Sequence, residues 1–169
     1  MRFFSGFCLA GEEELFDEYL PAYGSFVSGF SYGAQKALRY AITDESIKKL
    51  ILLSPAFYSH KEEAFKEAQI AAFVSNPKLY ALKLLKKSGL KDEERLKYEA
   101  NGTKEELTEL LYFEWRAEDF NRLIDRGASI EVFTGLVDRV VEQASAIEFF
   151  ESFGKIKLYK LENKNHILR

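Results

Sequence analysis

The feature of this sequence that points most directly to chemistry is a serine flanked by glycines. Residues 29–33 read Gly-Phe-Ser-Tyr-Gly, which fits the G-x-S-x-G pattern of a nucleophile elbow. A strand pattern precedes the motif and a helical pattern follows it, as the elbow requires. Gly29 and Gly33 leave room for a strained turn, because a side chain at either position would collide with neighbouring backbone. We therefore interpret Ser31 as a nucleophile and both glycines as elbow glycines.

A serine nucleophile needs a base, and the base needs a carboxylate that orients it. The chain has two histidines. His166 follows the last predicted strand, whereas His60 lies at a predicted helix start and is interpreted as a surface residue. Asp138 also follows a predicted strand, and the carboxyl ends of parallel strands meet at one edge of a sheet. The order Ser31, Asp138, His166 is that of α/β-hydrolases, so we predict these three as the catalytic residues.

A serine hydrolase also needs N–H groups that stabilise the oxyanion. The N–H of Tyr32, next to the nucleophile, is one expected donor. The Phe7 N–H is the other, because Gly6 after the first strand permits close backbone approach, although Ser5 stands where hydrolases commonly have histidine. Cys8 is an alternative nucleophile, but no elbow surrounds it and we interpret it as core packing.

The pattern around these residues predicts an α/β fold, because short apolar runs alternate with longer helical segments. The spacing predicts strands at 3–4, 25–28, 49–53, 129–133 and 155–159, and helices at 12–20, 32–41 and 142–153. We expect a compact, truncated α/β-hydrolase fold with about five mostly parallel strands.

A helical segment interrupts the alternation after the third strand. Residues 56–115 hold no convincing strand but several helix signals, and we interpret them as a lid within one domain that spans 1–169. The signals are capping boxes at Ser59–Glu62 and Thr103–Glu106, Pro77 at a helix start, and Gly89 and Gly102 at helix ends.

Composition excludes several classes of protein. The chain has 169 residues, 47% of them apolar, and no run near the roughly 18 apolar residues of a membrane helix. A net charge of −3 gives no footprint for nucleic acid. One cysteine and two histidines cannot form a zinc cluster, and no phosphate- or dinucleotide-binding motif is present. We expect a cytoplasmic protein without metal or cofactor.

Aromatic residues make up 15% of the chain, which indicates either core packing or an apolar pocket for an acyl chain. The lid residues that we expect to line such a pocket are Phe65, Ile70, Phe73, Leu79 and Leu82.

The whole chain resembles the short esterases of biotin synthesis, of the BioV type, that cleave pimeloyl-[acyl-carrier-protein] methyl ester. The resemblance rests on the compact length, the opening Met1–Phe7, the elbow Val27–Ser31, Glu131–Phe133 with Gly135-Leu136 before Asp138, and the ending Asn165-His166 with Leu168. It implies hydrolysis of the ω-methyl ester by Ser31, Asp138 and His166, and an acidic carrier protein as partner.

A basic segment agrees with that partner. Residues 77–100 carry seven positive and four negative side chains, a net +3 in a chain whose total is −3. We expect part of this segment to dock the carrier protein electrostatically, and the alternative is a solvated helix face. The candidate docking residues are Lys83, Lys86, Lys87, Lys91 and Arg95.

Other functions stay open on sequence grounds: another small carboxylesterase, an acyl thioesterase, an acyltransferase or a binding protein without catalysis. The chain ends just after His166, so no helix follows the last strand, and we expect a thinly covered sheet face and a homodimer.

Overall fold

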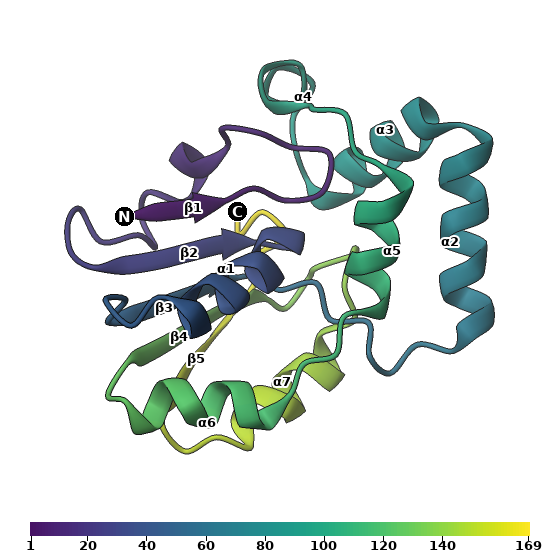
Figure 1. Ribbon diagram of the computed structural model, residues 1–169. Helices are drawn as coiled ribbons and strands as arrows, with labels where there is room; N and C mark the ends of the chain where they lie inside the picture. Colours follow the sequence, from purple (N-terminus) through teal and green to yellow (C-terminus); the bar gives the residue numbers. More distant parts are fainter.

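Five apolar runs of the sequence pair into one parallel sheet in the computed structural model, which describes residues 1–169 (Figure 1). The order in space is the order in the chain, β1-β2-β3-β4-β5, and each neighbouring pair is parallel. The strands are β1 (Arg2–Phe4), β2 (Phe26–Phe30), β3 (Lys49–Leu53), β4 (Ser129–Gly135) and β5 (Ile156–Leu161). The predicted fold class is therefore confirmed.

Seven α-helices and one 3-10 helix surround the sheet. They are η1 (Glu13–Phe16), α1 (Tyr32–Thr43), α2 (Glu63–Ser75), α3 (Pro77–Ser88), α4 (Asp92–Tyr98), α5 (Lys104–Tyr112), α6 (Ala117–Asp125) and α7 (Gln143–Glu151). Helices α2, α3 and α5 stand beyond the carboxyl ends of the strands, at the right of Figure 1, and α4 lies at the top of the view. The position of α2, α3 and α5 puts them over the edge of the sheet at which α/β proteins bind ligands.

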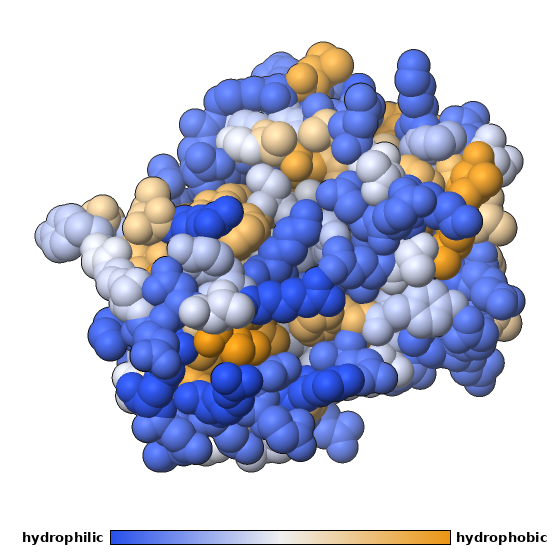
Figure 2. Space-filling model, viewed as in Figure 1, coloured by the Kyte–Doolittle hydropathy of each residue, from blue (hydrophilic) through white to orange (hydrophobic).

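One face of the sheet carries the larger core. Helix α1 buries Ala34, Ala37, Leu38 and Ala41, whose spacing forms one helical face. Helices α6 and α7 add Phe120 and Phe150 to the same cluster. The outer surface over this side is mostly hydrophilic, and its hydrophobic patches are separate (Figure 2).

The opposite face has no α-helix after β5 and is covered by irregular chain. Phe16 packs on Phe30 with ring centroids 4.7 Å apart, and Tyr19 packs on Phe133 at 5.1 Å. The helix predicted over 12–20 is wrong: only Glu13–Phe16 is helical, as a 3-10 turn. The segment instead crosses the sheet face and fills the place of a covering helix. Association into a homodimer stays a prediction.

The helix signals between β3 and β4 were correct only in part. Thr103 caps α5 in a capping box with Glu106, Pro77 begins α3, and Gly89 ends it with φ of 101°. Ser59 forms no capping box, because its hydroxyl donates to the carbonyl of Phe113 and α2 begins at Glu63. Gly102 lies beyond α4 and ends no helix; a Cβ there would meet Cys8 and Phe7.

Candidate active site

The turn after β2 holds Ser31 in a conformation that few residues adopt. Ser31 has φ of 53° and ψ of −111°, and its N–H donates to the carbonyl of Leu53 at 2.9 Å. A Cβ on Gly29 would strike the Gly33 carbonyl, and a Cβ on Gly33 would strike the Phe4 carbonyl. The elbow is therefore pressed against both α1 and β1, and Ser31 is only 8% exposed.

The structure brings Ser31, His166 and Asp138 together although they lie on three separate strand ends. His166 Nε2 lies 3.0 Å from Ser31 Oγ, and His166 Nδ1 lies 2.6 Å from Asp138 Oδ2. A carboxylate only accepts hydrogen bonds, so Nδ1 carries the proton and Nε2 accepts the serine hydroxyl. This is the tautomer that a general base for Ser31 needs.

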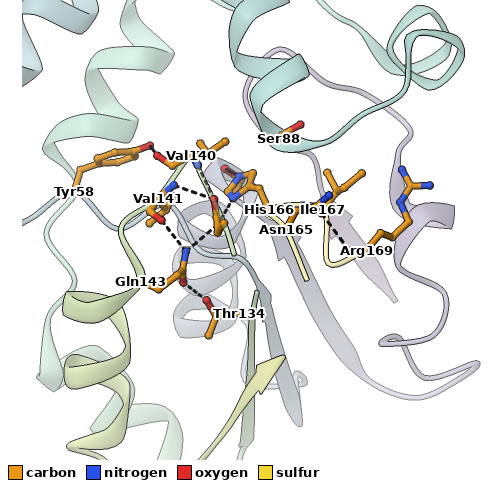
Figure 3. Close-up of polar contacts among 12 residues, drawn as sticks. Tyr58, Ser88, Thr134, Val140, Val141, Gln143, Asn165, His166, Ile167 and Arg169 are labelled. Atoms are coloured by element: carbon orange, nitrogen blue, oxygen red, sulfur yellow. Dashed lines mark hydrogen bonds and ion pairs between the residues drawn. The ribbon is translucent and has the colours of Figure 1, made fainter. Parts of the chain in front are cut away.

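Four hydrogen-bond donors converge on the carboxylate of Asp138 (Figure 3). Oδ1 accepts the N–H groups of Val140 at 2.6 Å and Val141 at 3.1 Å, and Oδ2 accepts Gln143 Nε2 at 2.8 Å besides His166. Burial raises the pKa of Asp138, but the attraction of His166 and the hydrogen bonds from His166 and the backbone N–H groups of Val141 and Val140 outweigh burial and hold the pKa below its usual value. Asp138 is therefore charged at neutral pH although its side chain is 0% exposed.

The two expected oxyanion donors have no hydrogen-bond partner within the chain. The Phe7 N–H donates no hydrogen bond within the chain. Tyr32 is the first residue of α1, so its N–H has no carbonyl in a preceding turn. Phe7 lines the same cavity as Ser31, and Tyr32 follows Ser31 in the chain, so both N–H groups remain candidates for an oxyanion hole.

An apolar cavity of about 330 Å³ opens onto Ser31 and His166. Helices α2, α3 and α5 supply most of its wall, and 13 of its 19 lining residues are hydrophobic. Among the lid residues expected to line a pocket only Phe65 does so, and the expectation was wrong for Ile70, Phe73, Leu79 and Leu82. The helices present other faces, with Gln69 and Ala72 from α2 and Tyr80, Lys83, Leu84 and Lys87 from α3.

The candidate docking residues fall into two groups. Lys83, Lys86 and Lys87 lie exposed on α3, and Lys83 and Lys87 also line the cavity. Lys91 directly precedes α4. Arg95 is only 18% exposed at its side chain and forms ion pairs with acidic residues of the same segment, so it has little freedom to bind a partner.

The two alternative reactive residues lie outside this arrangement. His60 contacts Glu142 at 3.1 Å, on the surface. Cys8 is buried, and burial raises the pKa of its thiol to about 12. A thiol with such a pKa is uncharged at neutral pH and is a poor nucleophile. No cluster of three metal-ligating side chains occurs, and no helix combines the length and apolar character needed to cross a membrane.

No protein-family model and no curated protein matches the chain. Solved structures do match. BpoC from Mycobacterium tuberculosis H37Rv, provisionally designated a non-heme bromoperoxidase, superposes with a TM-score of 0.66 at 13% identity, over 98% of this chain and 84% of its own. The chain has the α/β-hydrolase fold.

Two further α/β-hydrolase structures show the same similarity. The monoacylglycerol lipase of Paleococcus ferrophilus has a TM-score of 0.57 at 13% identity, over 98% of this chain and 84% of the lipase. The bromoperoxidase of Bacillus anthracis has a TM-score of 0.63 at 14% identity, over 84% of this chain. This chain spans only 60% of that bromoperoxidase, which agrees with a truncated form of the fold.

Sequence reasoning missed one residue beside the candidate oxyanion hole. Glu12 is 0% exposed and accepts the N–H of Gly6 at 2.8 Å. In the sequence it belongs to an acidic run with Glu13 and Glu14, which resembles a solvated helix start and gives no sign of burial.

Proposed function

We propose that this protein is a serine carboxylesterase that hydrolyses the methyl ester of pimeloyl-[acyl-carrier protein] methyl ester. The observation that carries the hydrolase part is the series of hydrogen bonds from Ser31 through His166 to Asp138. Ser31 and His166 of this series line the apolar cavity. The similarity to a lipase fold supports ester chemistry. The resemblance of the whole sequence to the BioV-type esterases supports the particular substrate.

The reaction begins when Ser31 Oγ attacks the ester carbonyl and passes its proton to His166 Nε2. The charged Asp138 stabilises the imidazolium that forms, and the N–H groups of Phe7 and Tyr32 stabilise the oxyanion. His166 then protonates the leaving methoxide, which departs as methanol. A water molecule attacks the acyl-enzyme with His166 again as base, and the free carboxylate leaves Ser31.

The cavity supports a linear acyl substrate that has a second, polar end. Its wall is mostly apolar, which suits a methylene chain. Away from Ser31 and His166, its charged lining residues are Lys83 and Lys87 of α3. A carrier-bound substrate places a phosphate and an acidic protein beyond its thioester, so two lysines at the cavity favour that end of the substrate.

The exposed charge of α3 supports docking of the acidic carrier protein. The helix contains four lysines and no acidic residue, and Lys83 and Lys87 form no ion pair within the chain. Unpaired positive charge steers an acidic partner and increases its association rate. We expect Lys83, Lys86 and Lys87 to contact the carrier rather than the acyl chain alone.

The test is charge reversal of Lys83, Lys86 and Lys87 to Glu together. The variant should lose at least about 10-fold in kcat/KM on the carrier-bound ester, because steering contributes roughly 10- to 1,000-fold to association. Its loss on p-nitrophenyl butyrate, which has no carrier, should be clearly smaller, because that ester feels only the change that Lys83 and Lys87 make to the cavity wall. Equal losses on both esters would contradict docking on α3.

A control variant separates local docking from total charge. Lys48, Arg122 and Lys155 are exposed, form no ion pair and lie on α6 or just before β3 and β5, away from the cavity. Reversal of these three to Glu changes the net charge by the same amount and should leave both activities close to those of the wild type.

A further inference from the structure

A buried carboxyl group lies directly behind the candidate oxyanion hole. Glu12 is 0% exposed; its Oε1 accepts the Gly6 N–H at 2.8 Å, and its Oε2 has no hydrogen-bond partner. A buried carboxyl with a free oxygen is rare enough to need an explanation. We propose that Glu12 is a positioning residue that fixes the backbone at Gly6 so that the Phe7 N–H, in the next peptide unit, faces the reacting carbonyl oxygen. This inference rests on the proposed esterase function.

The hydrogen bond of Glu12 acts on the peptide group that directly precedes the one carrying the donor, because the Gly6 N–H belongs to the Ser5-Gly6 peptide. The Phe7 N–H and the Gly6 carbonyl belong to one planar peptide unit, so they turn together. The Gly6 carbonyl accepts the Leu9 N–H at 3.2 Å, which fixes one side of that unit. Glu12 holds the Gly6 N–H, which lies in the Ser5-Gly6 peptide on the other side of the Gly6 Cα. With the peptide units on both sides of Gly6 held, rotation about the Gly6 backbone bonds is restricted and the Phe7 N–H has one direction.

The backbone at Gly6 needs a hydrogen bond to fix its conformation, because glycine adopts a wide range of backbone angles. The strand before it, β1, is three residues long and ends at Phe4. A residue with a side chain, which would restrict the backbone at this position, does not fit here, since a Cβ on Gly6 would lie 2.9 Å from the ring of Phe30. That ring also packs on His166 with centroids 5.0 Å apart, so Phe30 lies between the turn at Gly6 and the catalytic base.

The rest of the loop is attached independently of Glu12. The Ala10 N–H donates to the Tyr98 carbonyl, and the Ala100 N–H donates to the Cys8 carbonyl, both at 2.9 Å. Loss of the Glu12 carboxyl therefore frees the Ser5-Gly6 peptide and leaves the Gly6-Phe7 peptide held by the Leu9 N–H alone, while the following residues stay in place. A change at Glu12 should affect the oxyanion hole more than the fold.

In this proposal Glu12 acts through the hydrogen bond that it accepts from the Gly6 N–H, and not through a negative charge. A charge at this position would repel the developing oxyanion. Burial raises the pKa of Glu12 above its usual value, although the Gly6 N–H acts in the opposite direction, and this favours the uncharged form. Glutamine is uncharged and has the same length, and its carbonyl oxygen accepts the Gly6 N–H equally well.

The experiment compares Glu12→Met, Glu12→Asp and Glu12→Gln on p-nitrophenyl butyrate, with Glu13→Met as the control on an exposed neighbour. Each variant is also titrated with a trifluoromethyl ketone, whose serine adduct places an oxyanion in the hole. Methionine keeps the volume but removes the acceptor, and aspartate is one methylene too short to reach Gly6.

We expect Glu12→Met and Glu12→Asp to lose about 10-fold or more in kcat, less than the roughly 100- to 1,000-fold loss when a donor is removed outright. KM should change little, and Ki for the ketone should rise by the factor by which kcat/KM falls. Glu12→Gln and Glu13→Met should stay within about 3-fold of the wild type. A merely structural role would not move kcat and Ki together.

The proposal is overturned if folded Glu12→Met or Glu12→Asp keeps wild-type kcat, or if Glu12→Gln loses as much as they do. Should Glu12→Met fail to fold, the contrast between aspartate and glutamine decides the question. A wild-type protein that cleaves no ester through Ser31 overturns the proposed function itself, which is a different result from an active enzyme indifferent to Glu12.

Discussion

Replacement of Asp138 by Asn tests the hydrogen-bond series in a way that the geometry makes specific. Oδ1 accepts two backbone N–H groups, from Val140 and Val141, so the remaining oxygen of Asn must take that position. The new NH₂ group then replaces Oδ2 and faces His166 Nδ1. Because NH₂ only donates, His166 must accept at Nδ1 and carry its proton on Nε2, toward Ser31. A protonated Nε2 cannot take the serine proton.

The expected loss is about 10⁴-fold in kcat, or roughly 5.5 kcal/mol of transition-state stabilisation, as for a wrong tautomer in other serine hydrolases. The fold should tolerate the change. Gln143 donates to Oδ2 and to the Val141 carbonyl, and its Oε1 accepts the Thr134 hydroxyl. Rotation of the Gln143 amide would satisfy the Asn NH₂ and lose the bond to Val141, at a cost of about 0.5–1.5 kcal/mol.

The assay is kcat on p-nitrophenyl butyrate together with the thermal midpoint of unfolding. Asp125→Asn, at an exposed position on α6, is the matched control and should change neither quantity. If folded Asp138→Asn keeps more than about a tenth of the wild-type rate, Asp138 does not set the tautomer of His166 and the reasoning fails.

Three further outcomes follow from particular contacts. Gly33→Ala forces a Cβ onto the Phe4 carbonyl and should destabilise the protein by about 1–3 kcal/mol in thermal unfolding, whereas Gly154→Ala, in open space, should not. Thr103→Ala removes the side-chain cap of α5 and should cost about 0.5–2 kcal/mol in urea unfolding, so an unchanged midpoint would refute the cap. Burial raises the pKa of Glu12 above its usual value, so the folded state keeps this proton to higher pH than the unfolded chain, and the contribution of Glu12 to wild-type stability falls as pH rises above about 4.5. Glu12→Gln has no titrating group at this position, so its thermal midpoint should gain on that of the wild type as pH rises above about 4.5, and a difference that is constant with pH would contradict the shift.

The sheet and the meeting of the three residues at its edge could be predicted from the sequence. Continuous apolar runs such as Lys49–Leu53 define strands that are buried on both faces. Parallel pairing then brings the residues after β2, β4 and β5 to one edge, because every strand points the same way. This rule and the elbow pattern were sufficient to predict that Ser31, Asp138 and His166 meet.

Features that depend on side-chain packing could not be predicted. Residues 12–20 have a helical pattern, yet Phe16 and Tyr19 spread over a sheet face that no helix covers. The lining of the cavity depends on how α2 and α3 rotate against the core, which periodicity alone does not determine. Helix α6 was not anticipated, although it buries Phe120 and Leu123 at helical spacing.

Glu12 shows the same limit for a single side chain. Its neighbours Glu13 and Glu14 are exposed, and all three have the same residue type. Only the path of the chain from β1 to η1 places the Glu12 carboxyl within reach of the Gly6 N–H. A buried acidic residue was therefore visible only in three dimensions.

The central claim is tested most directly by methanol release from pimeloyl-[acyl-carrier protein] methyl ester, measured beside hydrolysis of p-nitrophenyl butyrate for the wild type and Ser31→Ala. We predict that the wild type cleaves the carrier-bound ester with the higher kcat/KM and that Ser31→Ala releases no methanol. Cleavage of the small ester alone would contradict the proposed substrate, and equal rates for the two proteins would contradict the serine mechanism.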